Sequence, residues 1–155
     1  MSAMLLSDVD DIGVSRSDAG KMMASTKSAL RFRQTDRGAF GVWAANATQV
    51  PHHTVYAAHY MLEAKERGHP IDHDVLVAAL RVVATIGATE PRSLEEARLA
   101  AYALYVMAMS GKVVTRELDA LVDVTQRAWP ESRKADLFRV WAGGTYALLK
   151  NEAKA

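Results

Sequence analysis

The sequence has no cysteine and no excess of charge of either sign. Without a thiol, the chain cannot form a disulfide, a thiolate zinc site, a cysteine nucleophile or a thioester of its own. Its 19 Lys and Arg are nearly matched by 18 Asp and Glu, which leaves a net charge of +1. Because no basic stripe for phosphate backbones stands out, nucleic acid is not an expected partner.

Long apolar runs and aromatic residues are also scarce. No stretch approaches the ~20 uncharged residues needed to cross a bilayer. The first residues, MSAMLLSDVDD, lack the basic flank and apolar run of a signal peptide. Direct insertion into a membrane is therefore not expected. The 155 residues are 50% apolar and 24% charged, which suits a single globular domain spanning 1–155.

Helical periodicity fills most of the chain, and no convincing strand is found. We expect an all-α fold with about six main helices and a weaker one near the N-terminus. Two helices are expected at 17–33 and 53–67, and four later ones begin near 72, 93, 115 and 132. The start and stop signals are Pro51, Asp72, Ser93 with Glu96, Thr115 and Ser132 for helix starts, and Gly68, Gly87 and Gly111 for helix ends.

The apolar positions of the first and last helices predict which faces are buried. In the first helix these positions are Met22, Met23, Ala29, Leu30 and Phe32. In the last helix they are Leu137, Val140, Trp141, Tyr146 and Leu148. The helix after Ser93 is apolar on most sides, which is typical of a helix buried all round.

An internal repeat sets the expected architecture. An offset of 43 residues places Gly68 on Gly111, and it also places Ala57-Ala58-His59 on Ala100-Ala101-Tyr102. A further 44 residues places Tyr102-Ala103-Leu104 on Tyr146-Ala147-Leu148. The physical interpretation is a two-helix unit with an inner and an outer helix. Stacked helical hairpins are therefore expected.

The stretch RQTDRGAFGVW, residues 33–43, combines turn-forming glycines with two large aromatic residues. It links an outer helix to an inner one. Gly38 and Gly41 would let the backbone turn, because glycine adopts conformations closed to other residues. Phe40 and Trp43 are expected to fill the end of the hairpin. We interpret all four residues as a structural turn.

This turn and the helix after it resemble part of a known family. The residues are Arg33-Gln34, Asp36, 38–43, 56–64 and Gly68, and later 102–106 with Gly111. In this order they resemble the thioester domain of bacterial alpha-2-macroglobulins, and the similarity covers roughly residues 20–150. The fold implied is an α/α toroid, a ring of six helical hairpins of the kind shared with terpenoid cyclases and protein prenyltransferases.

The resemblance also implies a function and a location. Alpha-2-macroglobulins are broad-spectrum endopeptidase inhibitors of the cell envelope or periplasm, which trap a protease after it cuts a bait region. Partners implied for this chain are the remainder of a parent protein and, through the parent, target proteases. Inhibition is implied rather than enzymatic activity, so no catalytic residue, cofactor or metal is assigned.

Two departures from the family limit this expectation. A ring of six hairpins needs roughly 260 residues at the repeat length found here, so the chain is expected to be an incomplete part of a larger toroid domain. The family's Cys-Xaa-Glu-Gln thioester motif has no counterpart, because there is no cysteine. Either the motif precedes this stretch, or the parent is a thioester-less paralogue. A partial toroid would show an exposed apolar flank, and such a chain is expected to associate with itself.

Two other functions compete with this one. A free-standing helical-repeat binding module would carry polar capping helices at both ends. Asp8-Val9-Asp10-Asp11 matches the D-x-D-D acid motif of class II terpene cyclases. A cyclase, however, needs an aromatic-lined cavity, and only 7% of the residues are aromatic.

Histidine spacing is compatible with metal binding at two places in the chain. His52 and His59 are seven residues apart, and His69 and His73 are four apart. Neither pair has a further ligand at helical spacing. We expect His59 to pack as a polar-tipped core residue, with the others on the surface.

Overall fold

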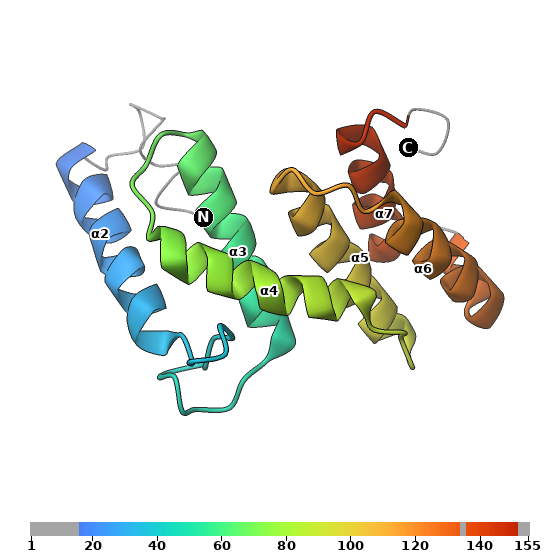
Figure 1. Ribbon diagram of the computed structural model, residues 1–155, viewed down its shortest axis with the longest axis horizontal. Helices are drawn as coiled ribbons and strands as arrows, with labels where there is room; N and C mark the ends of the chain where they lie inside the picture. The colour runs from blue at the N-terminus through green and yellow to red at the C-terminus, as the bar shows by residue number, and fades with distance from the viewer. Residues whose placement is uncertain (1–15, 134–135, 152–155) are drawn as a thin grey trace. The chain divides into compact units, whose positions relative to one another are not determined.

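A computed structural model describes residues 16–133 and 136–151 of the chain (Figure 1). Within these residues it contains six α-helices and one short 3-10 helix, and two isolated β-bridges but no strand. The predicted all-α fold is therefore confirmed. The elements are α2 Arg16–Arg33, α3 Pro51–Glu66, α4 His73–Ala88, α5 Leu94–Met109, α6 Thr115–Ala128, η1 Pro130–Arg133 and α7 Leu137–Leu148.

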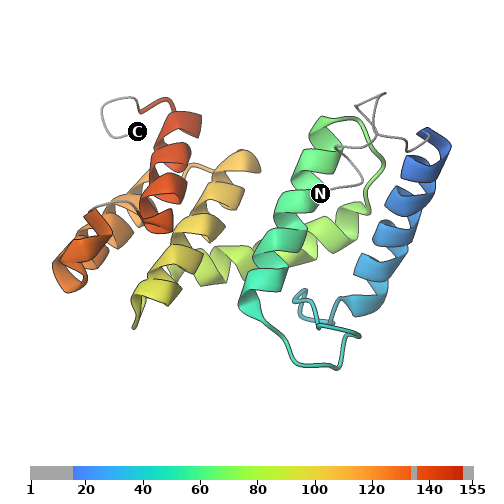
Figure 2. The same ribbon diagram turned by 180° about the vertical axis from the view of Figure 1, so that it is seen from behind.

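The chain divides into two compact units, Met1–Ala79 and Leu80–Ala155, and the boundary falls inside α4. In the first unit, α2 and α3 run antiparallel, with the turn of residues 34–50 at one end (Figure 2). The helix α3 has buried side chains on most of its sides, as expected for an inner helix. The core of this unit includes Val55, Ala58 and Met61 of α3 and Val75 and Leu76 of α4.

The helix α2 differs from the expectation. None of its described side chains is fully buried. Met22 is 44% exposed and Phe32 is 68% exposed, although both were predicted to face the core. The other three predicted positions, Met23, Ala29 and Leu30, are partly buried, and so is Arg33. The apolar positions of α2 are spread around the helix, so periodicity alone did not identify its inner face.

In the second unit, α5 packs most extensively against α7 and also contacts α6. The rings of Tyr102 and Trp141 stack with centroids 4.2 Å apart, and Tyr105 lies 5.2 Å from the same indole. A Cβ on Gly144 would come within 3.2 Å of the Tyr105 ring. The absence of a side chain at Gly144 therefore lets α7 approach α5 closely at this point.

Most of the predicted helix ends are found, with three corrections. Ser93 Oγ accepts from Glu96 N–H at 3.1 Å, although the Glu96 carboxylate accepts from Arg92 N–H rather than from Ser93. Asp72 precedes α4 and accepts from Val75 N–H, as predicted. The corrections concern Thr115, Ser132 and Gly87.

Thr115 is the first residue of α6 and not its cap, because the buried Val114 takes the cap position with no side-chain hydrogen bond. The last helix begins at Leu137 instead of near Ser132, because Asp136 caps it and Pro130–Arg133 forms the short 3-10 helix. Gly87 lies inside α4, where a Cβ would come within 2.9 Å of a Leu104 methyl carbon. Close packing, rather than helix termination, accounts for that glycine.

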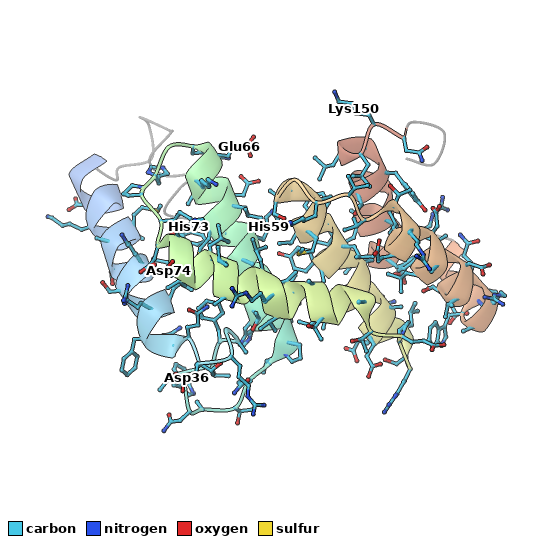
Figure 3. All side chains as sticks on the ribbon, in the orientation of Figure 1. Asp36, His59, Glu66, His73, Asp74 and Lys150 are labelled. Carbon is cyan, nitrogen blue, oxygen red and sulfur yellow. The ribbon has the colours of Figure 1, made fainter. Side chains whose placement is uncertain are left out.

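Three helices end in the same way. Gly68 after α3 has a φ of +76° and Gly111 after α5 has a φ of +87°. In each case the next residue donates back to the helix, from His69 N to Ala64 O and from Lys112 N to Met107 O. The end of α7 repeats this geometry with Lys150, whose φ is +57° (Figure 3). The caps at Gly68 and Gly111 support the 43-residue repeat between α3 and α5. The cap at Lys150 comes earlier in the sequence than the predicted 44-residue offset would place it.

Candidate interaction site

The turn between α2 and α3 is held by its own backbone hydrogen bonds. Thr35 N donates to Ala39 O at 2.8 Å, and Gly41 N donates to Arg33 O at 3.0 Å. Gly38 has a φ of +89°, and a Cβ there would lie 2.3 Å from Ala78 O of α4. A glycine is therefore required at position 38 for two reasons, the left-handed backbone and the close contact with α4.

Gln34 joins the turn to α4, which the sequence analysis missed. Its Nε2 donates to Gly38 O at 3.2 Å and to Val75 O at 2.8 Å. The side chain thus satisfies one carbonyl of the turn and one of a helix that lies about 40 residues away in sequence. A glutamine at the end of a helix carries no local signal for such a role, because its partners are brought close only by the fold.

The other three turn residues behave differently from one another. Phe40 is buried at 2% exposure, and its N–H donates to the Thr54 hydroxyl at 3.1 Å. Gly41 does not have a positive φ, but a Cβ there would lie 1.8 Å from Ala44 O. Trp43 is 76% exposed and does not fill the end of the hairpin. Only one of the two rings expected to pack there is therefore inside.

A face of α7 is apolar and exposed. Leu137 and Val140 are each 62% exposed and Leu148 is 47% exposed, although the sequence analysis placed them in the core. The core face of this helix is made instead by Phe138, Ala142, Thr145 and Tyr146. Leu137, Val140 and Leu148 lie on one side of the helix, on either side of the point where Gly144 contacts Tyr105, and the three are called here the α7 stripe. Large apolar side chains gathered on one face are typical of a surface that contacts another element.

The α7 stripe is positioned by an ion pair at the start of the helix. Arg98 of α5 donates two hydrogen bonds to the Asp136 carboxylate, at 3.0 and 2.6 Å, and the same carboxylate caps Phe138 N–H at 2.8 Å. The Arg98 hydrogen bond lowers the pKa of Asp136 below its ordinary value. Farther along, the Tyr146 hydroxyl donates to Asp119 of α6 at 2.6 Å, and burial raises the pKa of this tyrosine.

The histidines do not form a metal centre. Within the described residues, no group of three or more His, Cys, Asp or Glu is arranged to hold an ion. His59 is buried, as predicted, while His52 and His73 are exposed and His69 is partly buried. His59 and His73 lie on different helices (Figure 3). Burial lowers the pKa of His59, and the nearby Glu63, 3.8 Å from Nε2, opposes that shift only in part.

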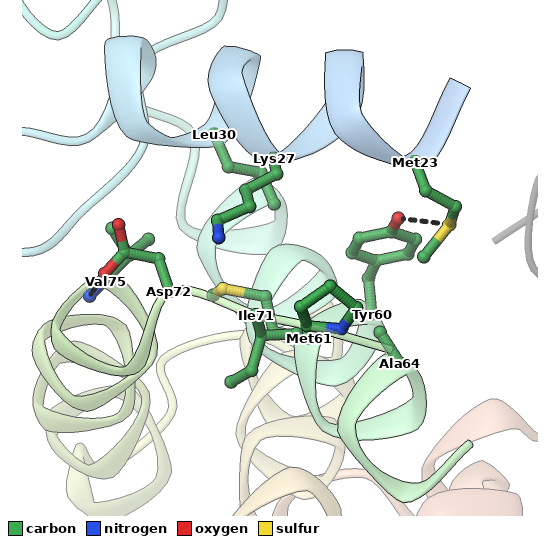
Figure 4. A pocket seen from close by; sticks show the side chains of 10 residues that line it. Met23, Lys27, Leu30, Tyr60, Met61, Ala64, Ile71, Asp72 and Val75 are labelled. Atoms are coloured by element: carbon green, nitrogen blue, oxygen red, sulfur yellow. Dashed lines mark hydrogen bonds between the residues drawn. The ribbon is translucent and has the colours of Figure 1, made fainter. Parts of the chain in front are cut away.

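A small cavity lies between α2 and the link from α3 to α4 (Figure 4). The Tyr60 hydroxyl donates to Met23 Sδ across it at 3.1 Å, and burial raises the pKa of this tyrosine. Near its edge Arg31 pairs with Asp72. Burial would raise the pKa of Asp72, but the Val75 N–H and the Arg31 guanidinium outweigh it and lower that pKa. The cavity holds water-sized space of about 20 Å³, so it serves packing rather than ligand binding.

The acid motif considered for cyclase chemistry, Asp8 to Asp11, lies outside the described residues. Among the described residues, none of the helices combines the length and the hydropathy needed to cross a membrane. The remaining candidate features are therefore the turn, the exposed aromatic residues near it and the α7 stripe. All of them are suited to contacts with another protein segment.

Comparisons with known proteins relate the chain to one group. No protein-family model matches it. It is 28% identical over 145 residues to an alpha-2-macroglobulin homolog of Yersinia pestis, covering 94% of this chain and 7% of that protein. It is 23% identical over 141 residues to an alpha-2-macroglobulin of Rickettsia conorii, covering 90% of this chain and 8% of that protein.

A solved structure shows the same fold. The native conformation of Escherichia coli alpha-2-macroglobulin matches 92% of this chain with a TM-score of 0.70 and 18% identity, over 9% of its own length. The resemblance found in the sequence is thus confirmed as homology to bacterial alpha-2-macroglobulins. The chain spans less than a tenth of the length of each of these relatives.

Proposed function

We propose that the chain is an incomplete part of the α/α-toroid domain of an alpha-2-macroglobulin-like protein, and that its own role is structural. The observation that carries this proposal is the similarity to two such proteins over at least 90% of the chain. The chain forms helical hairpins, and the exposed apolar surface of α7 would contact another part of the parent protein. It performs no chemistry of its own in this role.

The α7 stripe supports a role as part of a larger helical assembly. In each of the first two hairpins, an apolar helix is followed by a more amphipathic partner, α4 after α3 and α6 after α5. The third apolar helix, α7, instead leaves Leu137, Val140 and Leu148 exposed. A further hairpin of the parent would cover the stripe. In the isolated chain, association between two copies would cover it instead.

We further propose that the parent inhibits endopeptidases broadly by trapping them, in the periplasm or the cell envelope. The support is the similarity to two proteins named as alpha-2-macroglobulins, since this chain covers less than a tenth of either and has no cysteine of its own. Two forms of parent fit. One carries Cys-Xaa-Glu-Gln in another segment and captures proteases covalently, and the other lacks it and traps without a covalent bond.

The first experiment is to sequence the source DNA on both sides of this coding stretch. A long open frame with an export signal and Cys-Xaa-Glu-Gln upstream is expected for the covalent form, and the same frame without the cysteine for the other. The purified parent should then protect a large protein substrate from a protease while leaving a small peptide substrate accessible. A frame closed by stop codons around these residues would refute the proposal.

A second measurement tests the α7 stripe in the isolated chain. Sedimentation velocity should show self-association that Val140→Ser weakens, since that substitution removes a branched apolar side chain from the stripe. Val113→Ser is the matched control, because Val113 is 81% exposed but lies outside the stripe. Equal effects of the two substitutions, or none, would contradict the assignment of the stripe as a contact surface.

A free-standing helical-repeat module is the second candidate. It requires polar capping helices at both ends. The helix α2 satisfies this only in part at one end, since its exposed residues include Lys21, Lys27 and Arg31 but also Met22 and Phe32. The exposed α7 stripe argues against a polar cap at the other end, so the macroglobulin proposal accounts for more of the structure.

A further inference from the structure

A groove in the first unit has the features of a binding site that the proposed function does not use. It lies between the second half of α2, the turn and the first half of α3, with a volume of about 300 Å³. This is at the lower end of the range for ligand sites in proteins. Its floor is apolar, from Leu30, Phe40, Ala57 and Tyr60, and its rim includes Thr26, Arg33, His53 and Tyr56.

The charge in this groove is of one sign. Arg33 is its one permanently charged lining residue, and no carboxylate lines it. Four arginines of the described chain pair with carboxylates, Arg31, Arg67, Arg98 and Arg127. The Arg33 guanidinium has no such partner among the described residues, although the side chain is partly buried. A partly buried guanidinium gains when a carboxylate ligand supplies paired acceptors.

The start of α3 adds to the positive character of the rim. Its cap residue, Val50, makes no side-chain hydrogen bond, and the first turn holds no acidic residue. That turn instead includes His53, which lines the groove. Pro51 has no N–H and the His53 N–H donates to Val50 O, so it is the dipole of the helix that favours a nearby anion here. Arg33 and the start of α3 therefore both favour a negatively charged group in this groove.

The large aromatic side chains left exposed in the described residues also gather here in the sequence. Tyr56 lines the groove and is 44% exposed, Trp43 adjoins the lining residue Val42, and Phe32 adjoins Arg33. Aromatic residues and arginine are enriched at the centres of protein interfaces, whereas exposing them to water without a partner brings no benefit. With Arg33 and the exposed Tyr56 in its lining, the groove contains two residue types that are typical of protein-binding surfaces.

We propose that this groove binds a segment of a partner protein in which an acidic residue stands next to a large apolar one. The carboxylate pairs with Arg33, and the apolar side chain lies on the floor made by Phe40, Ala57 and Tyr60. Charge complementarity selects this occupant over a basic or purely apolar one. The proposal does not depend on protease trapping, and it holds equally for a free-standing module.

The test uses the full chain labelled with ¹⁵N and two short probes, acetyl-Leu-Glu-amide and acetyl-Leu-Gln-amide, followed by NMR titration. The amide signals of Thr26, His53 and Tyr56 should shift in a saturable way, and the glutamate peptide should bind roughly tenfold more tightly than the glutamine peptide. Arg33→Gln should abolish this preference. Arg37→Gln is the matched control, because Arg37 is an exposed arginine of the same turn that does not line the groove.

Several outcomes would overturn the proposal. Equal binding of the two peptides would remove the role of the carboxylate, and equal losses in the two arginine variants would indicate unspecific attraction. Acetate that binds as tightly as the glutamate peptide would mean a simple anion site with no apolar contact. If Arg33→Gln does not give a dispersed spectrum, Arg33→Lys keeps the charge and should retain a reduced preference for the glutamate peptide. An unchanged or absent preference in that variant contradicts the paired geometry.

Discussion

Replacing Phe40 by alanine should destabilise the first unit far more than replacing Trp43, although the two rings are three residues apart in one turn. Phe40 is 2% exposed, and Phe-to-Ala substitutions at buried sites cost about 3–5 kcal/mol. Trp43 is 76% exposed, so its removal should change the free energy of unfolding by no more than ~0.5 kcal/mol. The expected difference between the variants is therefore about 2.5 kcal/mol or more, a large share of the roughly 5–15 kcal/mol that is typical of a domain.

Urea unfolding followed by far-ultraviolet circular dichroism measures this difference without relying on tryptophan fluorescence, which Trp43→Ala would alter. Phe40→Leu serves as the graded control, because it keeps most of the apolar volume and should cost about 1 kcal/mol. A loss below about 1 kcal/mol for Phe40→Ala would refute the account of the turn. So would an equal loss for Trp43→Ala, since the argument depends on their opposite burial.

Three further outcomes are expected. Burial lowers the pKa of His59, so as the pH falls this histidine takes up a proton in the unfolded chain before it does so in the folded one. The free energy of unfolding should therefore decrease as the pH drops below about 6.5. In a plot of the urea midpoint against pH, His59→Gln should flatten that part of the curve. Asp136→Ala should cost about 1 kcal/mol or more through loss of the cap. The pKa of Asp136 is lowered in the folded chain, so the stabilisation that this carboxylate provides should be complete above its ordinary pKa near 3.8. It should disappear as the pH falls through the lower pKa of the folded chain, which acid titration of the original protein and of Asp136→Ala would show. Lys150→Gly should raise the thermal midpoint, because Lys150 has a left-handed backbone that costs a non-glycine residue about 1 kcal/mol; a lower midpoint would contradict this.

Local chemistry could be predicted from the sequence wherever a few neighbouring residues decide the structure. The Ser93 cap, the proline at the start of α3 and the glycines after α3 and α5 all act within one helical turn of themselves. Two helix starts were predicted wrongly because a good cap residue does not by itself fix where a helix begins. Thr115 and Ser132 are good cap residues, but the chain begins those helices at positions fixed by packing and by the Arg98–Asp136 pair.

The candidate sites depended on contacts that are remote in sequence. Gln34 bonds to Val75, and Arg33 lines a groove with Tyr56, and no spacing rule connects these residues. The exposure of Trp43 and of the α7 stripe was missed for a related reason. Large apolar residues are predicted to be buried by default, whereas here Trp43 and the α7 stripe are exposed.

The helix α2 has a consequence for how the first unit opens. None of its described side chains is fully buried, and it is held to the rest of the unit by contacts such as Tyr60 with Met23 and Arg31 with Asp72, which cost little to break. Its amide hydrogens should therefore exchange with solvent through local detachment, while those of α3 exchange only when the core opens. Within residues 16–133 and 136–151, a protease meeting the folded chain would find its first sites in α2, which also forms one wall of the groove.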